Sequence, residues 1–369
     1  MAENSKIEWT THTFNPWRGC TKVSRGCENC YAETLSKRNP ATLGVWGPNG
    51  TRVVAAEKTW SDPLKWNRDA ECNCGGGFGG THSEYCPQAN RPRVFCDSLS
   101  DVFEDWNGPI WNSKGLIGHV YHDDGEWGFG PTMHPDNWNR QTMANARFLT
   151  MDDLRRRLFK LFDETDNLDW LLVTKRPQNI LKMWVSTPGI SPYCPFDSYE
   201  QASESNWRHN VWLLSSAEDQ ESYDRRAPHL WACRDLCPVI GWSMEPLLGP
   251  ISIGNKWDGT RTRNWRDCWS WVIVGGESGP HARPMHPDWA RDIRDQCREL
   301  GIPFFFKQWG EYAPEESEAH CGSDEPCLPW ADKSDLCPMY HVGKKAAGRV
   351  LDGREWNEYP KVVVSCTKS

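Results

Sequence analysis

Two neighbouring stretches, TMDDLRRRLFKLFDE (150–164) and DWLLVTKRP (169–177), decide what fold this chain can adopt. In the first, Thr150 stands where a helix N-cap belongs, Asp153 follows three residues later, and the leucines recur on one helical face. The second is apolar throughout rather than alternating, which is typical of a strand buried on both faces. A helix that leads directly into such a strand predicts a βαβ unit.

The same kind of strand recurs along the chain. Further runs are RVFCDSLSD (93–101), NVWLLSSAEDQ (210–220), VIGWSMEP (239–246), WVIVGGESG (271–279) and IPFFFKQWG (302–310). A second helix pattern, HPDWARDIRDQCRELG (286–301), has Pro287 near its start and Gly301 at its end. With a first strand around IEWTTHTFNPWRG (7–19), about seven strands are expected. We predict one α/β domain over 1–369, a partial or full TIM-like parallel β/α barrel.

Irregular insertions interrupt this plan, and two of them are rich in cysteine. They cover residues 68–92, 105–148, 186–208 and 312–340. Loops of this length in a compact enzyme usually serve as lids, binding loops or metal-stapled subdomains.

Charge and composition exclude some classes of protein. The chain has 369 residues, 42 of them basic and 50 acidic, for a net charge of -8, which argues against a basic nucleic-acid clamp. The opening MAENSKIEWT has no apolar core of a signal peptide, and no run reaches the length of a membrane span. We therefore expect a cytoplasmic protein without a membrane partner. Sixteen cysteines in a reducing compartment favour metal sites and buried thiols over disulfides.

Three of these cysteines, Cys20, Cys27 and Cys30, lie in the first predicted strand-to-helix loop, within NPWRGCTKVSRGCENCYAETLSKRNP (15–40). Three thiolates can bind three irons of a [4Fe-4S] cluster and leave the fourth open. An open iron can hold the amino and carboxylate groups of S-adenosylmethionine, and electron transfer would then give an adenosyl radical. Two alternatives remain open: a zinc site completed by a distant His or Cys, and a redox pair of thiols.

Motifs along nearly the whole chain carry a family resemblance. They are IEWT, FNPWRGCTKVSRGCENCYAE, TKRP, EPLLGPI, VIVGGESGPHARP, FFFKQWGE and GKKAAGRVLDGREW. Together they resemble a phage- and prophage-associated three-cysteine-motif family, labelled a domain of unknown function and regarded as similar to radical S-adenosylmethionine enzymes.

The resemblance implies a TIM-like barrel, with Cys20, Cys27 and Cys30 as cluster ligands. It also implies an electron donor such as flavodoxin or ferredoxin, and the host cytoplasm if the protein is phage-encoded. The spacing departs from that of radical enzymes at large: six residues separate Cys20 from Cys27, and the aromatic Tyr31 follows Cys30 instead of preceding it.

Polar residues at the ends of the predicted strands are the other candidate site residues. For the amino group of S-adenosylmethionine we favour Ser100 and Asp101, and for its carboxylate Lys175, Arg176 or Ser215. Gly275 and Gly276 would let backbone approach a ligand, and Glu277 would face the ribose or the substrate. Ser98 and Glu218 complete the cofactor-binding set by position, and the candidate catalytic residues are Glu245, Lys307 and Gln308.

A Gly-rich segment, ECNCGGGFGGTHSEYC (71–86), offers ligands for a structural zinc: Cys72, Cys74, His82 and Cys86. The alternative is a disordered loop with spare thiols. A looser group, which a second metal or cluster would use, consists of His320, Cys321, Cys327, Cys337 and His341. Cys194, Cys233 and Cys237 would either join that group or form a site of their own. The remaining three are expected to be core thiols: Cys96, Cys268 and Cys297.

Three functions fit these features. The first is a radical S-adenosylmethionine enzyme acting on a nucleotide or DNA base, in hypermodification or repair. The second is a zinc-containing barrel hydrolase or lyase with Asp101, Glu245 and Glu277 as acid and base. The third is a non-catalytic, zinc-stabilised nucleic-acid-binding protein. A basic patch near the C-terminus offers contacts to phosphate: Lys344, Lys345 and Arg349.

Overall fold

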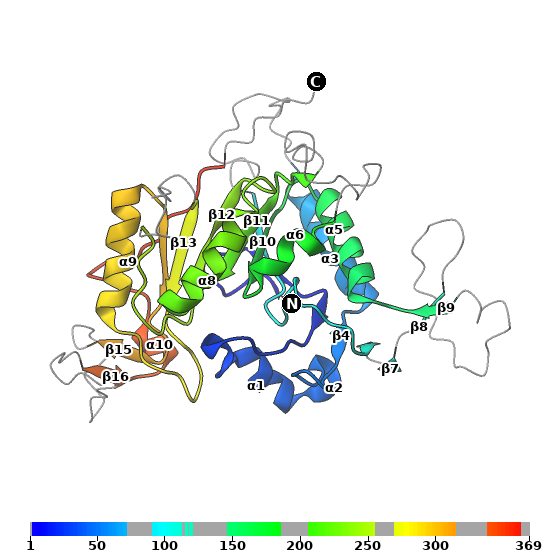
Figure 1. The fold of residues 1–369 in the computed structure, drawn as a ribbon, viewed down its shortest axis with the longest axis horizontal. Coiled ribbons are helices and arrows are strands. Elements are labelled where there is room, and N and C mark those ends of the chain that lie inside the picture. Colours follow the sequence, from blue (N-terminus) through cyan, green and yellow to red (C-terminus); the bar gives the residue numbers. More distant parts are fainter. Residues whose placement is uncertain are drawn as a thin grey trace, which may run out of the picture.

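The computed structural model describes residues 2–71, 91–112, 115–116, 118–120, 146–185, 206–254, 269–314 and 338–362. Its centre is an eight-stranded sheet with the spatial order β1 (Ala2–Glu3), β2 (His12–Phe14), β5 (Arg93–Cys96), β10 (Asp169–Thr174), β11 (Val211–Ser216), β12 (Val239–Met244), β13 (Trp271–Gly275) and β14 (Phe304–Gln308). Strand β1 is antiparallel to β2, and every other neighbouring pair is parallel. The seven parallel strands curl into a half-barrel (Figure 1). The prediction of a parallel β/α barrel is confirmed in its partial form.

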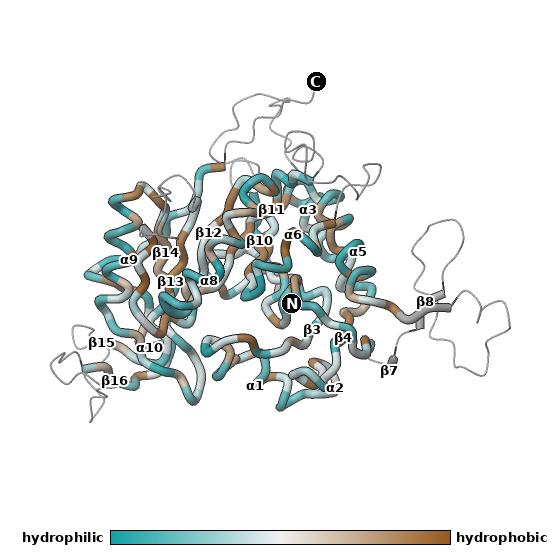
Figure 2. Tube along the Cα trace, in the orientation of Figure 1, coloured by the Kyte–Doolittle hydropathy of each residue, from teal (hydrophilic) through white to brown (hydrophobic). Residues whose placement is uncertain are grey.

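Helices cover the outer face of the half-barrel (Figure 1). They are α3 (Glu57–Asp69), α5 (Met151–Asp163), α6 (Ile180–Met183), α8 (Gln220–Trp231) and α9 (Pro287–Leu300). Helix α5 begins as predicted, because Thr150 and Asp153 form a reciprocal capping box. Helix α9 ends at Gly301, whose φ of 69° is left-handed and suits glycine. Hydrophobic residues concentrate along the central strands, whereas the outer turns of the helices are hydrophilic (Figure 2).

The two faces of the sheet have separate cores, because side chains alternate between faces along each strand. The outer face packs on the helices, for example through Leu154 and Leu158 of α5, both fully buried. The inner face forms a second cluster: Trp9, Leu171, Trp212, Leu214, Val239, Trp271, Ile273 and Phe305. Ile7 from the N-terminal segment and Tyr359 and Val362 from the C-terminal segment pack against it.

Smaller elements surround the mouth of the half-barrel. The cysteine loop contains β3 (Trp17–Arg18) and a 3-10 turn, η1 (Arg25–Cys27), and leads into α1 (Tyr31–Arg38) and α2 (Pro40–Leu43). A four-stranded sheet joins β3 to β4 (Arg52–Val54), β6 (Ile110–Asn112) and β7 (Gly115–Leu116). Two hairpins add β8 (Gly118–Val120) with β9 (Ala146–Phe148), and β15 (Tyr312–Pro314) with β16 (Met339–His341). Helix α10 (Lys344–Ala347) follows β16.

Three of the predicted insertions lie between strands of the central sheet, and the fourth follows its last strand. Residues 105–148 contain β6 to β9, and 312–340 begin in β15 and end in β16. Residues 68–92 begin in the last turn of α3, and their centre lies outside the described residues, as does most of 186–208. No helix in the described part of the chain is long and apolar enough to cross a membrane.

Candidate active site at the mouth of the half-barrel

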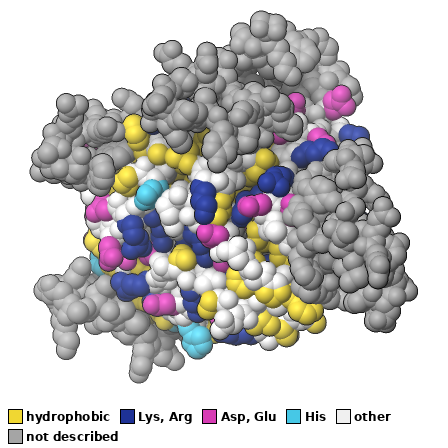
Figure 3. All heavy atoms as spheres, turned by 45° about the vertical axis from the view of Figure 1, so that its right-hand side comes forward, with side chains coloured by type: hydrophobic (Ala, Val, Ile, Leu, Met, Phe, Trp, Pro, Cys, Tyr) yellow, Lys and Arg dark blue, Asp and Glu magenta, His cyan; other side chains and the backbone are white. Residues whose placement is uncertain are grey.

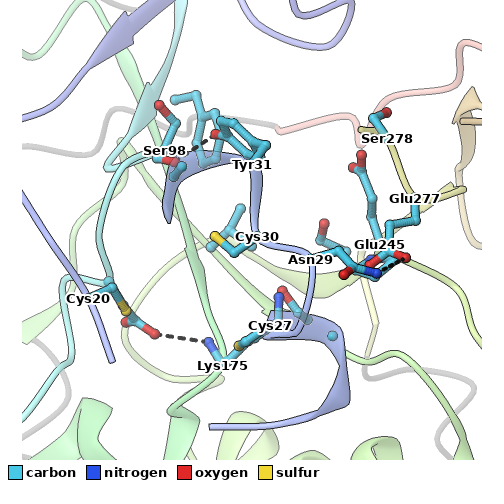
Figure 4. A pocket seen from close by; sticks show the side chains of 18 of the residues that line it. Cys20, Cys27, Asn29, Cys30, Tyr31, Ser98, Lys175, Glu245, Glu277 and Ser278 are labelled. Atoms are coloured by element: carbon cyan, nitrogen blue, oxygen red, sulfur yellow. Dashed lines mark hydrogen bonds between the residues drawn. The ribbon is translucent and has the colours of Figure 1, made fainter. Parts of the chain in front are cut away.

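A pocket of about 460 Å³ lies where the carboxyl ends of the parallel strands meet the cysteine loop (Figure 4). It is lined by residues from the N-terminal segment, the cysteine loop and the ends of six of the strands, β5 and β10 to β14. Ligand sites of parallel α/β folds usually occupy this end of the sheet. The volume is also in the usual range for small-molecule sites.

The pocket brings together most of the residues selected from the sequence. Those that line it are Cys20, Cys27, Cys30, Ser98, Ser100, Asp101, Lys175, Arg176, Glu245, Gly276, Glu277, Lys307 and Gln308. Ser215, Glu218 and Gly275 are not among the lining residues. Cys72, Cys74, His82 and Cys86, the expected zinc ligands, lie outside the described residues.

Strand alternation explains why Ser216, and not Ser215, lines the pocket. On β11, Trp212 and Leu214 belong to the inner cluster, so the next inward position is Ser216. Ser215 is fully buried and donates to the carbonyl of Thr174 at 3.2 Å. The same alternation places Ser243 of β12 in the pocket, two residues before Glu245. Our sequence interpretation missed both inward serines, although a period of two from the buried tryptophan would have found Ser216.

The Cys20 thiol lies against a buried guanidinium. Arg176 donates from Nη1 to Cys20 Sγ at 3.4 Å and from Nη2 to the carbonyl of Thr21 at 2.6 Å. Burial raises the pKa of Cys20 to about 12, while the charge of Arg176 acts in the opposite direction. Burial also tends to lower the pKa of Arg176, but Asp101 and the other acidic neighbours outweigh it and raise that pKa. The guanidinium therefore stays charged beside the thiol.

Asp101 and Glu104 fix this arginine. Asp101 accepts hydrogen bonds from Thr174 Oγ1, the amides of Lys175 and Phe103, and Arg176 Nη1. Glu104 accepts from Arg52, which is fully buried, at 2.6 and 2.8 Å, and from the amide of Thr21 at 2.9 Å. Asp101 thus lies in the pocket wall with its carboxylate already engaged, and Glu104 is a site residue that the sequence did not reveal.

Cys27 and Cys30 follow a close approach between the loop, at Gly26, and Glu218 after β11. Cys27 ends η1, and Cys30 is the N-cap residue of α1, although its side chain makes no capping hydrogen bond. Burial raises the pKa of Cys30, and the nearby amides of Glu33 and Ala32 oppose the rise. A Cβ on Gly26 would lie 3.2 Å from the carboxyl carbon of Glu218, so only glycine fits without displacing that side chain. Glu218, which pairs with Arg226 at 2.8 Å, therefore supports the cysteine loop at Gly26.

The opposite wall carries an ion pair. Lys307 Nζ lies 2.8 and 2.7 Å from the two carboxylate oxygens of Glu245. Gln308 Nε2 donates to Glu245 at 3.1 Å and to Ser278 Oγ at 2.9 Å. The three candidate catalytic residues are thus in mutual contact, within one network at the ends of β12 and β14.

Asp97 and Lys175 are pocket residues whose side chains make no hydrogen bond or ion pair within the described part of the chain. Asp97, immediately after β5, is 3% exposed, has a φ of 75°, and neither of its carboxylate oxygens accepts a hydrogen bond. Burial raises the pKa of Asp97 well above its ordinary value. Lys175 makes a hydrogen bond through its backbone amide alone, so its ammonium group is available to a ligand. Asp97 was absent from the sequence prediction, because it resembles an ordinary strand-end carboxylate.

Glycines also join the ends of β13 and β14. A Cβ on Gly276 would lie 1.9 Å from the carbonyl oxygen of Trp309, and one on Gly310 would lie 2.1 Å from that of Glu277. The two backbones are therefore in direct contact, which no other residue type permits. The expected role of Gly276, close backbone approach, is seen here between two protein segments.

The sulfur atoms of Cys20, Cys27 and Cys30 face a common space in the pocket (Figure 4). Within the described ranges, no three His, Cys, Asp or Glu side chains are grouped tightly enough to hold a single metal ion. Cys96 and Cys297 are buried as expected of core thiols, and Cys233 and Cys237 are buried too. The remaining cysteine and histidine candidates lie outside the described residues, apart from His341 on β16: Cys194, Cys268, His320, Cys321, Cys327 and Cys337.

Fold and site together define a parallel α/β half-barrel protein with a three-cysteine pocket at its mouth. The model of the family described as "Protein of unknown function (DUF5131)" matches residues 4–110 and 143–360, and the chain belongs to this family. No curated protein and no solved structure matches the chain significantly.

Proposed function

We propose that this protein is a radical S-adenosylmethionine enzyme whose Cys20, Cys27 and Cys30 ligate a [4Fe-4S] cluster. The observation that carries the proposal is the meeting of three thiols from one strand-to-helix loop in a pocket that also contains a carboxyl group and an ammonium group without hydrogen-bond partners in the described chain. An iron–sulfur cluster bound by three cysteines keeps one iron for a chelating ligand. When bound, such a cluster supplies the electron that cleaves the sulfonium of S-adenosylmethionine to a 5′-deoxyadenosyl radical.

The chemistry of the donor set fits the cluster. All three side chains are soft sulfur ligands, which iron–sulfur clusters select. Cys20 receives an N–H from Arg176, and Cys30 lies at the N-terminus of α1, near the amides of Glu33 and Ala32. Hydrogen bonds of this kind stabilise a metal-bound thiolate and tune the metal.

The unpartnered charges fit the amino-acid end of S-adenosylmethionine. Asp97 offers a carboxylate to the ammonium group, and Lys175 offers an ammonium to the carboxylate. Both side chains face inward, at the ends of the neighbouring strands β5 and β10. Asp97 thereby takes the role that the sequence suggested for Asp101 and Ser100, because the protein itself engages Asp101 fully.

The rest of the pocket provides a place for the substrate. Trp9, Phe95 and Val173 form an apolar floor that excludes water, and the Lys307–Glu245 pair faces it with hydrogen-bonding groups. Lys6 and Lys344 line the pocket without an ion-pair partner in the described part of the chain, and suit an anionic group. A nucleotide or DNA base is the substrate class that we propose.

The alternatives receive less support from the geometry. A hydrolase would need free acid and base groups, but Glu245 is paired with Lys307 and Glu277 with Arg283. A simple nucleic-acid-binding protein would favour a continuous basic field. On the face drawn in Figure 3, Lys and Arg side chains are interspersed with acidic ones. The zinc loop at 72–86 remains a prediction.

Purification without oxygen tests the proposal. We expect a brown protein that contains iron and sulfide and that releases 5′-deoxyadenosine when it is reduced with S-adenosylmethionine. Cys27→Ala should lose the iron and the colour and keep any zinc bound by 72–86. A colourless protein with zinc alone, even after attempted cluster reconstitution, would contradict the proposal and favour the zinc hydrolase.

A further inference from the structure

Glu277 is the centre of a hydrogen-bond network that reaches the cysteine loop. It follows β13 and is 6% exposed. Its Oε2 accepts from Asn29 Nδ2 at 3.0 Å, and from the amide and Nε of Arg283 at 2.8 and 2.9 Å. Its Oε1 accepts from Arg283 Nη2 at 2.7 Å. Figure 4 shows Asn29 and Glu277 side by side at the pocket wall.

Arg283 extends this network along the loop. Its Nη1 donates to Glu28 at 2.6 Å, and its Nη2 donates to the carbonyl of Arg25 at 2.9 Å. Asn29 also donates to the carbonyl of His281 at 2.7 Å. Every one of these loop contacts falls between residues 25 and 29, so they bear on Cys27 and Cys30 rather than on Cys20.

The electrostatics favour the ionised form of Glu277, at the centre of this network. Burial disfavours the ionised form of Glu277, but the hydrogen bonds from Arg283 and Asn29 together outweigh it and lower the pKa. The pKa of Arg283 is raised, chiefly by its hydrogen bonds to Glu277. Charge-assisted hydrogen bonds of this kind are stronger than neutral ones.

Cys20 belongs to a different network. Arg176 contacts its sulfur and the carbonyl of Thr21, and Glu104 accepts from the amide of Thr21. The described contacts of these residues lie on β4, β10 and the segment after β5, away from Arg283. The two sets of side chains share no residue; within the loop, Lys22 donates to the carbonyl of Glu28 at 2.9 Å, and Glu218 contacts the loop at Gly26.

We infer that Glu277 and Arg283 are positioning residues that hold the Cys27–Cys30 half of the loop in its ligand arrangement before any metal binds. The Arg176–Glu104 pair does the same for Cys20, through a separate set of contacts. The identity of the bound group rests on the proposed function, whereas the arrangement of the loop does not. A loop that is ordered in advance binds its group with a smaller loss of conformational entropy.

Hydrogen–deuterium exchange of the metal-free chain tests the inference directly. Glu277→Gln keeps the shape of the side chain but replaces one oxygen of a carboxylate that accepts from four N–H donors with an NH2 group, so exchange of the amides in 25–31 should become faster. Exchange in 19–22 should not change. Glu104→Gln should give the opposite pattern.

Glu245→Gln is the matched control, because it makes the same change in the same pocket at a carboxylate whose hydrogen bonds in the described chain come from Lys307 and Gln308. It should leave exchange in 25–31 at the wild-type rate. Equal exchange in Glu277→Gln and wild type, or faster exchange spread evenly over both halves, would overturn the inference. Thermal unfolding of each variant separates a local effect from general destabilisation.

Metal retention gives a second readout. We expect Glu277→Gln to lose iron to a chelator about 10- to 100-fold faster than wild type, as is typical when a supporting hydrogen bond of a metal ligand is removed. Adding Asn29→Asp exchanges donor and acceptor, and should restore part of the retention and of the slow exchange in 25–31. No recovery in either measurement would contradict the direct Asn29–Glu277 contact. A wild-type chain that binds no iron would refute the proposed function and leave the exchange result standing.

Discussion

Asp97 combines a backbone conformation and a charge that both cost stability. A φ of 75° lies in the left-handed region, which non-glycine residues adopt at an energetic cost. Its buried carboxylate accepts no hydrogen bond in the described part of the chain. Strained and unsatisfied groups persist mainly where function needs them, which supports a ligand-binding role for this residue.

Asp97→Asn should therefore stabilise the ligand-free protein and weaken its binding of S-adenosylmethionine. Because burial raises the pKa of Asp97, the folded chain keeps this proton to a higher pH than the unfolded chain does. The free energy of unfolding thus falls as the pH rises above about 4. The variant should remove this fall and gain about 1–3 kcal/mol at neutral pH, because its amide is uncharged and a buried group without a partner costs more as a charge than as a neutral group.

Denaturant unfolding across pH, together with calorimetric titration of S-adenosylmethionine, measures both effects. Binding should weaken roughly tenfold or more, because hydrogen bonds to charged groups contribute about 1.5–3 kcal/mol. Asp105→Asn, at an exposed carboxylate paired with Lys182, serves as the control and should change neither quantity. A destabilised Asp97→Asn with normal binding would show that the carboxylate has a structural role.

At the scale of the single element, strand alternation decides which polar residue reaches the pocket. Ser216 points inward from β11, and Ser215 points to the helical side. Ser216→Leu should fill part of the pocket and weaken binding of S-adenosylmethionine at least tenfold. Ser215→Ala should leave binding unchanged and cost about 1 kcal/mol of stability through its lost hydrogen bond. Equal binding defects in titrations of both variants would contradict this assignment.

Elements with local signals were predictable from the sequence, and contacts between distant segments were not. Thr150 and Asp153 predicted the start of α5, Pro287 and Gly301 predicted the two ends of α9, and continuous apolar runs predicted β10 to β14. The sequence also predicted that the cysteine loop lies at the mouth of the half-barrel, because this loop follows the first strand directly in the chain. Arg176 beside Cys20, and Glu277 beside Asn29, join segments about 150 and 250 residues apart, and no local pattern encodes such pairings.

At the scale of the whole molecule, the two ends of the described chain close the inner face of the half-barrel. Tyr359 packs on Trp271 and Phe305, and Arg93 lies 3.8 Å from the centre of its ring. Its hydroxyl donates to the carbonyl of Glu8 at 3.3 Å, which links the C-terminal to the N-terminal segment. A half-barrel lacks the strands that cover the inner face in a closed barrel. The N-terminal and C-terminal segments cover this face instead.

Tyr359→Ala should therefore destabilise the whole molecule by about 2 kcal/mol, less than the usual cost of truncating a fully buried aromatic side chain, because this ring is half-buried. Tyr359→Phe keeps the ring and should lose no more than about 1 kcal/mol with the hydrogen bond. Denaturant unfolding of the two variants provides the comparison. If they were equally stable, the ring would not be part of the interior closure.

The contact between Gly276 and Gly310 has a consequence for how this sequence can change. Each glycine faces the backbone of the other segment, so enlarging either one forces the two strand ends apart. One partner cannot compensate for the other, because neither has a side chain left to shorten. Glu311 after Gly310 donates its amide to the carbonyl of Glu277, and its carboxylate accepts the amide of Lys344. A substitution at either glycine would therefore shift both Glu277, which supports the cysteine loop, and Glu311, which contacts Lys344 at the rim of the pocket. Almost no substitution at these two positions is expected to be neutral.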